Sequence, residues 1–332
     1  MKRKILILFA ISISLLIIGC GKNNKNIINN MKKNIEELSS YHLVGTLEII
    51  NNEDIYTYDV DVSYKETDLF RVSLKNINNN HIQILLKNPE GVYVLTPALN
   101  KSFKFQSDWP YNNSQIYLLQ TIIKDIENDS NATVEEKDDY YIITSKVNYA
   151  NNDELVKQKV YVDKNLNVKK VEVLNKNDNV LMRIDVKDID TKPNFNEGYF
   201  DLNSSLNTSI TAEDIKPVSK LDTIIYPMYI PTQTYLATQN KINIQDGERV
   251  ILTFDGESPF MLVQETSSVE KELTTIPVSG SPEIIGDSIG VLSNNSVTWS
   301  SNGIDYYVTS NSLTEKELLT VANSINILPV SK

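Results

Sequence analysis

The sequence predicts an α+β protein with two parts: an N-terminal curled antiparallel sheet covered by helices, and a smaller C-terminal α+β module. Three observations predict this. The length of 332 residues corresponds to about two domains of roughly 150 residues. Apolar residues recur with a period of two from Tyr41 to about Val186, as they do in antiparallel strands with one buried face. Short apolar stripes with spacings of three and four interrupt or flank that region and indicate helices.

The first twenty residues have the layout of a secretory signal. Lys2, Arg3 and Lys4 precede an apolar run from Ile5 to Ile18, which is short for a membrane-spanning helix. The run ends in Ile17-Ile18-Gly19-Cys20, which resembles the bacterial lipobox. A small residue before the cut and a thiol after it are what lipidation requires, so we expect residues 1–19 to be a signal peptide and Cys20 to carry diacylglycerol. An N-acyl chain such as palmitate is a further expected modification, and the alternative is an uncleaved anchor with an incidental cysteine.

The charge balance bears on location and on partners. The chain has 32 Lys+Arg and 43 Asp+Glu, a net charge of −11, and loss of the three positive charges in residues 1–19 leaves about −14. A body this acidic argues against a nucleic-acid partner. We expect the mature protein at the outer face of the cytoplasmic membrane, held by lipid on Cys20, with residues 20–30 as a polar tether.

Two helices and a series of strands are predicted before residue 203. Residues 27–40 carry an apolar stripe that includes Met31 and Ile35, and Ser114 is positioned to cap a second helix, whose stripe runs from Leu118 to Ile126. The intervening runs predict eight to ten strands joined by Asn/Asp/Lys turns. We therefore assign residues 31–203 to one half-barrel domain.

The remaining chain predicts a linker and a second module. Residues 204–225 lose the alternation and are assigned as the linker, and residues 226–329 as a small α+β domain. The stretch from Val278 to Asp287 is rich in Gly, Pro and Ser and predicts turns. The last helix is expected after a capping box formed by Thr314 and Glu317.

Few residues point to catalysis or metal binding. One cysteine excludes an internal disulfide, and His42 and His81 fall in different predicted strands with no triad or metal set near them. Asp59 and Asp61 share a strand face that we interpret as a solvated outer surface rather than an acid/base pair. We therefore predict no catalytic residues, no metal and no cofactor other than the covalent lipid.

An aromatic set after the central hairpins is the one candidate binding feature outside Cys20. It consists of Phe103, Phe105, Trp109 and Tyr111. The set is compatible with the mouth of a groove or with a partner-docking site, but ordinary core between a hairpin and a helix is the interpretation we favour.

The ordered motifs resemble the LolA-like lipoproteins of Gram-positive spore formers, a group that includes YdcC-type and GerS-type proteins and is more distantly similar to LolA and RseB. The resemblance rests on the lipobox, on NPEGVYVLTPALNKSFKFQSDWP (Asn88–Pro110), on VYVDKNLNVKKVEV (Val160–Val173) and on NEGYFDLN (Asn196–Asn203). The C-terminal motifs, such as YPMYIPT, resemble the extra domain of the longer YdcC-type members.

This resemblance implies a half-barrel without enzymatic activity. It suggests a membrane-anchored protein that binds and regulates a cell-envelope partner in sporulation or germination, such as a cortex amidase, in or near the forespore intermembrane space. The alternative is a carrier-like protein whose half-barrel groove holds an acyl chain or a lipoprotein. A cell-wall hydrolase is a third, less supported hypothesis.

Overall fold

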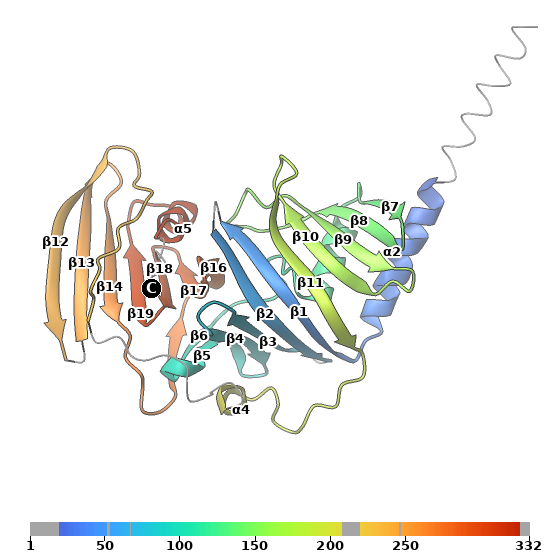
Figure 1. Cartoon of the computed structure of the whole chain (residues 1–332), viewed down its shortest axis with the longest axis horizontal. Coiled ribbons are helices and arrows are strands. Elements are labelled where there is room, and N and C mark those ends of the chain that lie inside the picture. The colour runs from blue at the N-terminus through green and yellow to red at the C-terminus, as the bar shows by residue number, and fades with distance from the viewer. Residues whose placement is uncertain (1–19, 52–53, 67, 208–219, 246, 326–332) are drawn as a thin grey trace, which may run out of the picture.

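The computed structural model describes residues 20–51, 54–66, 68–207, 220–245 and 247–325 (Figure 1). Two sheets and four helices lie within those ranges. The signal segment, the middle of the predicted linker and the chain after residue 325 lie outside the described residues. The fold class predicted from the sequence, an α+β protein built on curled antiparallel sheet, is confirmed.

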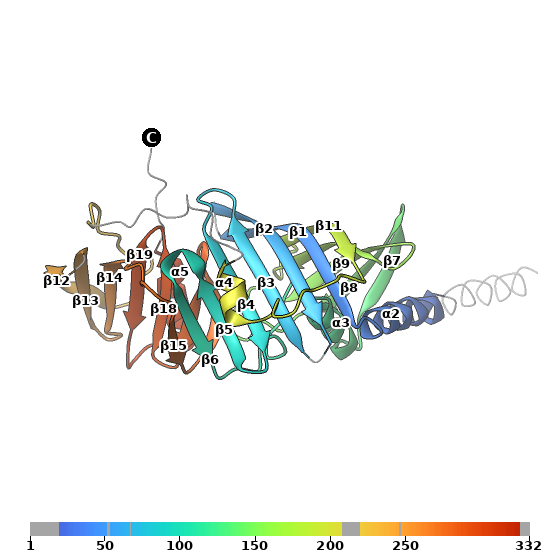
Figure 2. The same cartoon turned by 90° about the horizontal axis from the view of Figure 1, so that it is seen from below.

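The larger sheet has twelve strands and curls around one layer of helices (Figure 2). Its spatial order is β15-β6-β5-β4-β3-β2-β1-β11-β10-β9-β8-β7, with antiparallel pairing except between β15 and β6. The strands are β1 (Ser40–Asn51), β2 (Asp54–Lys65), β3 (Leu69–Asn76), β4 (Ile82–Asn88), β5 (Gly91–Thr96), β6 (Lys101–Phe105), β7 (Thr133–Lys137), β8 (Tyr140–Lys146), β9 (Lys157–Asp163), β10 (Val168–Leu174), β11 (Val180–Asp190) and β15 (Thr274–Val278). The sequence predicted eight to ten strands, fewer than this, and assigned the segment that forms β15 to the other module.

Helices α2 (Cys20–Glu36) and α3 (Leu119–Asn128) fill the concave face of this sheet. The predicted stripe of α2 is confirmed, because Met31 and Ile35 are buried against the strands. The helix begins at Cys20, so residues 20–30 are helical where a polar tether was predicted. Once the packed turns around Met31 have nucleated the helix, each further residue adds one hydrogen bond, so polar residues with modest propensity extend it.

The predicted cap of α3 is wrong. Leu118, in an extended conformation, holds the N-cap position without a side-chain hydrogen bond. Ser114 instead donates to the carboxylate of Asp125 at 2.7 Å and accepts from the backbone N–H of Asn148 at 2.7 Å. Its hydroxyl therefore ties the loop before α3 to the helix and to the loop after β8.

A segment that we call the strap, residues 195–207, crosses the convex face of the same sheet. Phe200 and Leu206, the latter in α4 (Leu202–Asn207), pack against strands β4 and β5. Both faces of these strands are therefore buried. The first residues of the predicted linker thus belong to the packed large domain, and at the far side of the undescribed stretch Leu221 is already buried in the core of the small sheet.

The smaller sheet has seven strands in the order β12-β13-β14-β19-β18-β17-β16. Helix α5 (Glu315–Asn323) covers one face, and its predicted capping box is confirmed, with both Thr314–Glu317 hydrogen bonds present. The strands are β12 (Thr234–Ile244), β13 (Gly247–Gly256), β14 (Phe260–Thr266), β16 (Ser281–Ile285), β17 (Ser288–Ser293), β18 (Ser296–Ser301) and β19 (Ile304–Thr309). Strand β16 forms where turns were predicted. Its Pro282 lacks a backbone N–H, which a strand tolerates at the edge of a sheet, and β16 is an edge strand.

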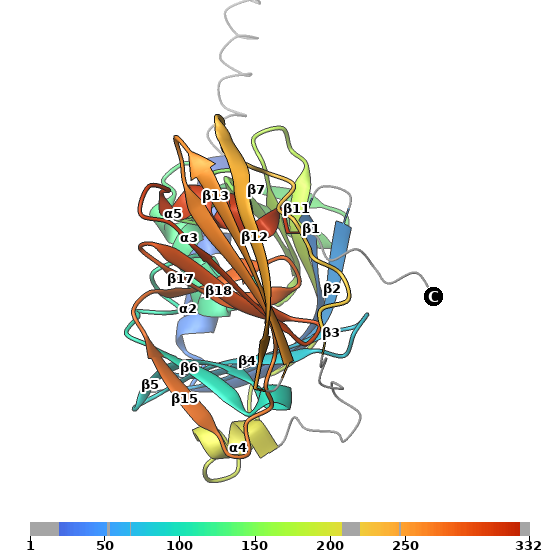
Figure 3. The ribbon, with the colours of Figure 1, turned by 90° about the vertical axis from the view of Figure 1, so that its left-hand side faces the viewer.

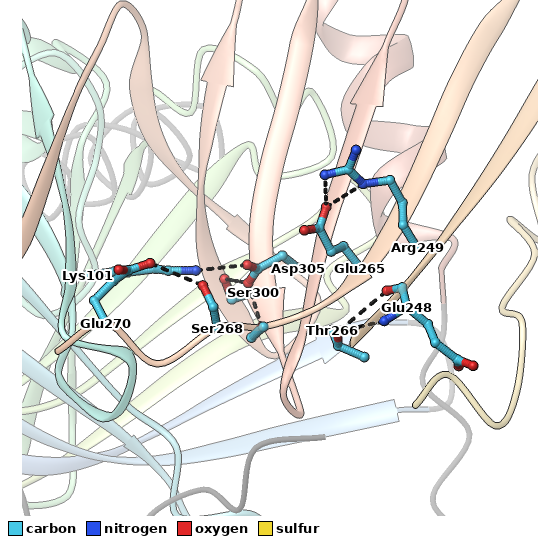
Figure 4. A network of polar contacts seen from close by, with 10 residues as sticks. Lys101, Glu248, Arg249, Glu265, Thr266, Ser268, Glu270, Ser300 and Asp305 are labelled. Carbon is cyan, nitrogen blue, oxygen red and sulfur yellow. Dashed lines mark hydrogen bonds and ion pairs between the residues drawn. The ribbon is translucent and has the colours of Figure 1, made fainter. Parts of the chain in front are cut away.

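Three kinds of contact join the two sheets. Strand β15, which follows β14 in the chain, leaves the small sheet and pairs in parallel with β6 of the large one. The buried Gln83 side chain on β4 forms two hydrogen bonds with the backbone of Ile289 on β17, at 2.8 and 2.6 Å. Lys101 on β6 pairs at 3.0 Å with Asp305 on β19 (Figure 4). Because these contacts involve backbone and buried groups, they fix the small sheet against the large one.

Candidate partner-binding surfaces

The predicted anchor lies at one end of the molecule. Helix α2, which begins at Cys20, projects from the end of the large sheet, and the small sheet lies at the opposite end of the long axis (Figure 1). The lipidation of Cys20 stays a prediction. Across the described ranges, none of the helices combines the length and the apolar character that spanning a bilayer requires.

The predicted aromatic set is divided between core and surface. Phe105 and Trp109 are buried, with Trp109 only 1% exposed and its ring edge-on to Phe70 at 6.0 Å between centroids. These two side chains belong to the core of the half-barrel. That the set docks a partner stays a prediction, and within the set only Phe103 and Tyr111 could contact one.

Tyr111 lies at the surface among charged groups. Its hydroxyl donates to Asp68 at 2.9 Å, and the ammonium groups of Lys87 and Lys124 lie over its ring at 5.0 and 5.6 Å from the centroid. Partial burial, followed by the adjacent Asp68 carboxylate, raises the pKa of Tyr111, which keeps the phenol protonated. These contacts already occupy its polar and aromatic surfaces.

Phe103 lines an open hollow where the two sheets meet. The hollow has a volume of about 410 Å³, within the size range of ligand pockets. Strand β15 and the β17–β18 hairpin bring the other lining residues to Phe103, and these are Val278, Ser279, Val291, Ser293–Ser296 and Thr298. The sequence could not reveal this site, because its two sides are about 180 residues apart and are brought together by tertiary contacts such as the β6–β15 pairing.

The concave interior that an acyl chain would need is occupied by side chains. Met31 and Ile35 from α2, and Ile122 and Ile126 from α3, are buried among strand residues such as Val171. A hollow near the joint, lined by Tyr58 and Gln83 among others, is only about 10 Å³, about the space of one water molecule. Acyl-chain binding at the concave face would thus require the helices to move.

A charged cluster on the convex face ties the strap to the sheet. The Nε2 atom of His42 lies 2.9 Å from the Asp61 carboxylate, and this hydrogen bond raises the pKa of His42. The guanidinium of Arg71 lies 4.0 Å from Asp61 and 5.5 Å from the ring centroid of Tyr199, whose hydroxyl is 3.0 Å from Ser63 Oγ. Arg71 and Ser63 contact the strap at Tyr199, and His42 and Asp61 lie beside Arg71 in the same cluster.

Asp59 and His81, the other candidates examined in the sequence, do not join that cluster. Asp59 is exposed and forms an ion pair with Lys187 at 3.2 Å, as expected for a solvated strand face. His81 is buried near the joint of the sheets. Within the part of the chain that is described, no group of three His, Cys, Asp or Glu side chains is arranged to hold a metal ion.

A series of exposed apolar side chains precedes and includes β12 of the small sheet, and the sequence analysis did not identify them as exposed. They lie on β12 and on the segment before it, with Met228 80% exposed and Tyr235 60% exposed. The others are Tyr226, Tyr229, Ile230, Leu236 and Ile242. An available signal was the near absence of charge: residues 223–245 contain one charged residue, Lys241.

Comparison with known proteins adds a full-length relative. No family model matches the chain. The sporulation protein YdcC of Bacillus subtilis (strain 168) is 33% identical over 328 residues, which cover 98% of this chain and 97% of the relative. This identity and coverage are sufficient to assign the family.

Solved structures show more distant similarity. A chain of the Pseudomonas aeruginosa MucA/MucB complex matches with a TM-score of 0.33 at 12% identity, covering 90% of this chain and 98% of that one. The LolA superfamily protein NE2245 of Nitrosomonas europaea matches with a TM-score of 0.32 at 12% identity over 54% of this chain and 98% of its own. A chain from the Clostridioides difficile CwlD amidase–GerS lipoprotein complex has a TM-score of 0.23 at 19% identity, over 49% of this chain and 93% of its own. All three scores lie below 0.5, so the family rests on the full-length relative: the chain belongs to the family of the sporulation protein YdcC.

Proposed function

We propose that this chain is a non-catalytic lipoprotein that binds and regulates a protein of the cell envelope during sporulation. The observation that carries the proposal is its 33% identity to a sporulation protein across nearly its whole length. The lipobox ending at Cys20 supports attachment to the outer face of the cytoplasmic membrane, which in a sporulating cell includes the forespore intermembrane space. A cell-wall enzyme is the class of partner we propose.

The geometry favours a protein partner over a small apolar ligand. The concave face is packed with helix and strand side chains, including Met31 and Ile122, whereas exposed apolar side chains lie on the outside of the small sheet. Several large exposed apolar side chains in one part of a protein are typical of interaction sites. The lipid tether would raise the local concentration of such a partner at the membrane.

Metabolic labelling tests the anchor. Cells that express the full chain are fed an alkyne analogue of palmitate, and the label on the protein is measured together with its distribution between membrane and soluble fractions. Cys20→Ala should abolish the label, whereas the matched variant Lys22→Ala should retain the label and the membrane fraction of the original chain. Label that persists in Cys20→Ala would contradict lipid anchoring at this residue.

Crosslinking tests the partner. The full chain is crosslinked in vegetative and in sporulating cells, and the captured proteins are identified by mass spectrometry and verified by reciprocal capture. The proposal predicts a cell-wall enzyme that is captured in sporulating cells and whose capture falls with Cys20→Ala. Capture of no envelope protein, together with an unaltered spore cortex in a deletion strain, would refute it.

A further inference from the structure

Strand β12 forms an open edge that differs from the other sheet edges of the described chain. Two sheets give four edge strands, and three of these are five residues long. Strand β7 carries Glu135, Glu136 and Lys137, β15 contains Pro277, and β16 contains Pro282. Short length, charge and proline are three of the features that stop an edge from pairing with another chain, and a β-bulge is a fourth.

Strand β12 lacks the first three features and has one β-bulge, between Leu236 and Thr238, beyond which its pairing with β13 is regular from Thr238 to Ile244. It is eleven residues long, contains no proline and has one charged residue, Lys241, which is paired with Glu248 at 2.8 Å. It lies next to β13 at the end of the small sheet (Figure 3), and within the described residues it is hydrogen-bonded to β13 on one side only. Nearly all of its side chains are exposed. Its other side therefore presents a row of backbone donors and acceptors to solvent.

The stretch of chain that leads into β12 and includes it has the composition of an interface. At the chain average of 23% charged residues, the 23 residues from 223 to 245 would carry about five charges, and they carry one. The exposed apolar side chains Tyr226, Met228, Tyr229, Tyr235 and Ile242 lie in the same stretch. Depletion of charge with enrichment of Tyr and Met distinguishes protein interfaces from ordinary surface.

A membrane is a poor occupant for this surface. Insertion of a sheet edge into lipid would leave backbone N–H and C=O groups without partners, at a large cost for each group. The anchor-bearing helix α2 also lies at the other end of the long axis (Figure 1). The edge thus faces away from the membrane that Cys20 would be attached to.

We infer that β12 is a strand-addition site, at which an extended, uncharged and partly apolar segment of a partner protein pairs with the edge. This inference rests on the proposed function, because it names the surface on which the envelope partner binds. Main-chain hydrogen bonds along β12 would provide affinity, and contacts with Tyr235 and Ile242 would provide selectivity for apolar side chains at alternate positions.

Site-specific photocrosslinking in living sporulating cells tests the inference with the full lipidated chain. A benzophenone amino acid replaces Tyr235 in one strain and Tyr140, an exposed tyrosine of β8 in the large sheet, in the matched control. The inference predicts a protein adduct from position 235, with the crosslink mapped to an uncharged segment of the partner, and a much weaker adduct from position 140.

A second set of variants tests the strand surface itself. Ile242→Lys should reduce the adduct at position 235 about tenfold, because a charge is placed where the partner strand would be apolar. Ile55→Lys, the same change at an exposed isoleucine of β2, should leave it unchanged. Both isoleucines are exposed, so neither variant should impair folding.

The other outcomes overturn the inference in distinguishable ways. An adduct at position 140 but not at 235 would show that a partner exists and that β12 does not bind it. An adduct with lipid would identify a membrane contact, and an adduct containing only this chain would identify a self-associating edge. Absence of protein adducts at both positions would count against β12 and against the proposed function together.

Discussion

The Gln83 contact between the sheets makes a quantitative prediction about how the two parts unfold. Gln83 is 4% exposed, its amide nitrogen donates to the carbonyl of Ile289 at 2.8 Å, and its amide oxygen accepts from the N–H of the same residue at 2.6 Å. Gln83→Ala would leave two buried backbone groups without partners, at about 1–3 kcal/mol each. We expect a loss of about 2–6 kcal/mol in the free energy of unfolding.

The two tryptophans allow each part to be observed separately. Trp109 is buried in the large sheet and Trp299 in the small one, where its ring stacks on Tyr306 at 4.9 Å. Trp299→Phe and Trp109→Phe backgrounds therefore report on one part each. Urea unfolding of the mature chain carrying Cys20→Ala, followed by fluorescence, should give coincident midpoints for the two reporters.

Gln83→Ala should then lower the midpoint or separate the two transitions. With a denaturant dependence of about 3 kcal/mol per molar urea, a loss of about 2–6 kcal/mol shifts a midpoint by about 0.7–2 M. The matched variant Gln106→Ala removes an exposed glutamine after β6 and should change stability by less than about 0.5 kcal/mol. Unchanged midpoints for both reporters in Gln83→Ala would refute the reasoning.

Three further predictions concern single side chains. Burial raises the pKa of Asp125 to about 6, above its unfolded value, so the ionised carboxylate destabilises the fold above pH 6. Asp125→Asn should therefore stabilise the protein by about 2–3 kcal/mol at pH 8, and calorimetry should show this gain disappearing toward pH 4. Thr314→Ala should cost about 1 kcal/mol by removing the cap of α5, whereas Thr314→Ser retains it, as measured by urea unfolding. Trp109→Ala should lower the free energy of unfolding by about 3–5 kcal/mol, because Trp109 is a core residue, and Tyr111→Phe by less than about 0.5 kcal/mol, because Tyr111 lies at the surface. Equal losses for the two variants in the same assay would contradict this division between core and surface.

Local patterns in the sequence predicted most elements because their causes are local. The alternation in β2 placed Val60 and Val62 on the buried face, and the capping box of Thr314 and Glu317 fixed the start of α5. The cap at Ser114 failed because the hydroxyl found a stronger tertiary partner, the Asp125 carboxylate. Local propensity decides an element only where no such partner competes.

The joint and the edge depend on contacts that no window of sequence contains. The pairing of β15 with β6 joins residues such as Ile276 and Phe103, which are more than 170 positions apart. It also explains why the boundary between the two predicted domains is less simple in the structure than in the sequence. The open edge of β12 could have been suspected from the charge-poor stretch 223–245, but only the sheet order identifies it as an edge.

The central claim is that this protein acts by binding and regulating a cell-wall enzyme. The most direct test adds the purified mature chain to the enzyme that crosslinks to it in sporulating cells, and measures both their stoichiometry and the rate of that enzyme on isolated peptidoglycan. The account predicts a stable complex and a several-fold change in rate that Ile242→Lys reduces and Ile55→Lys does not. A complex that leaves the rate unchanged, or failure to form any complex, would contradict it.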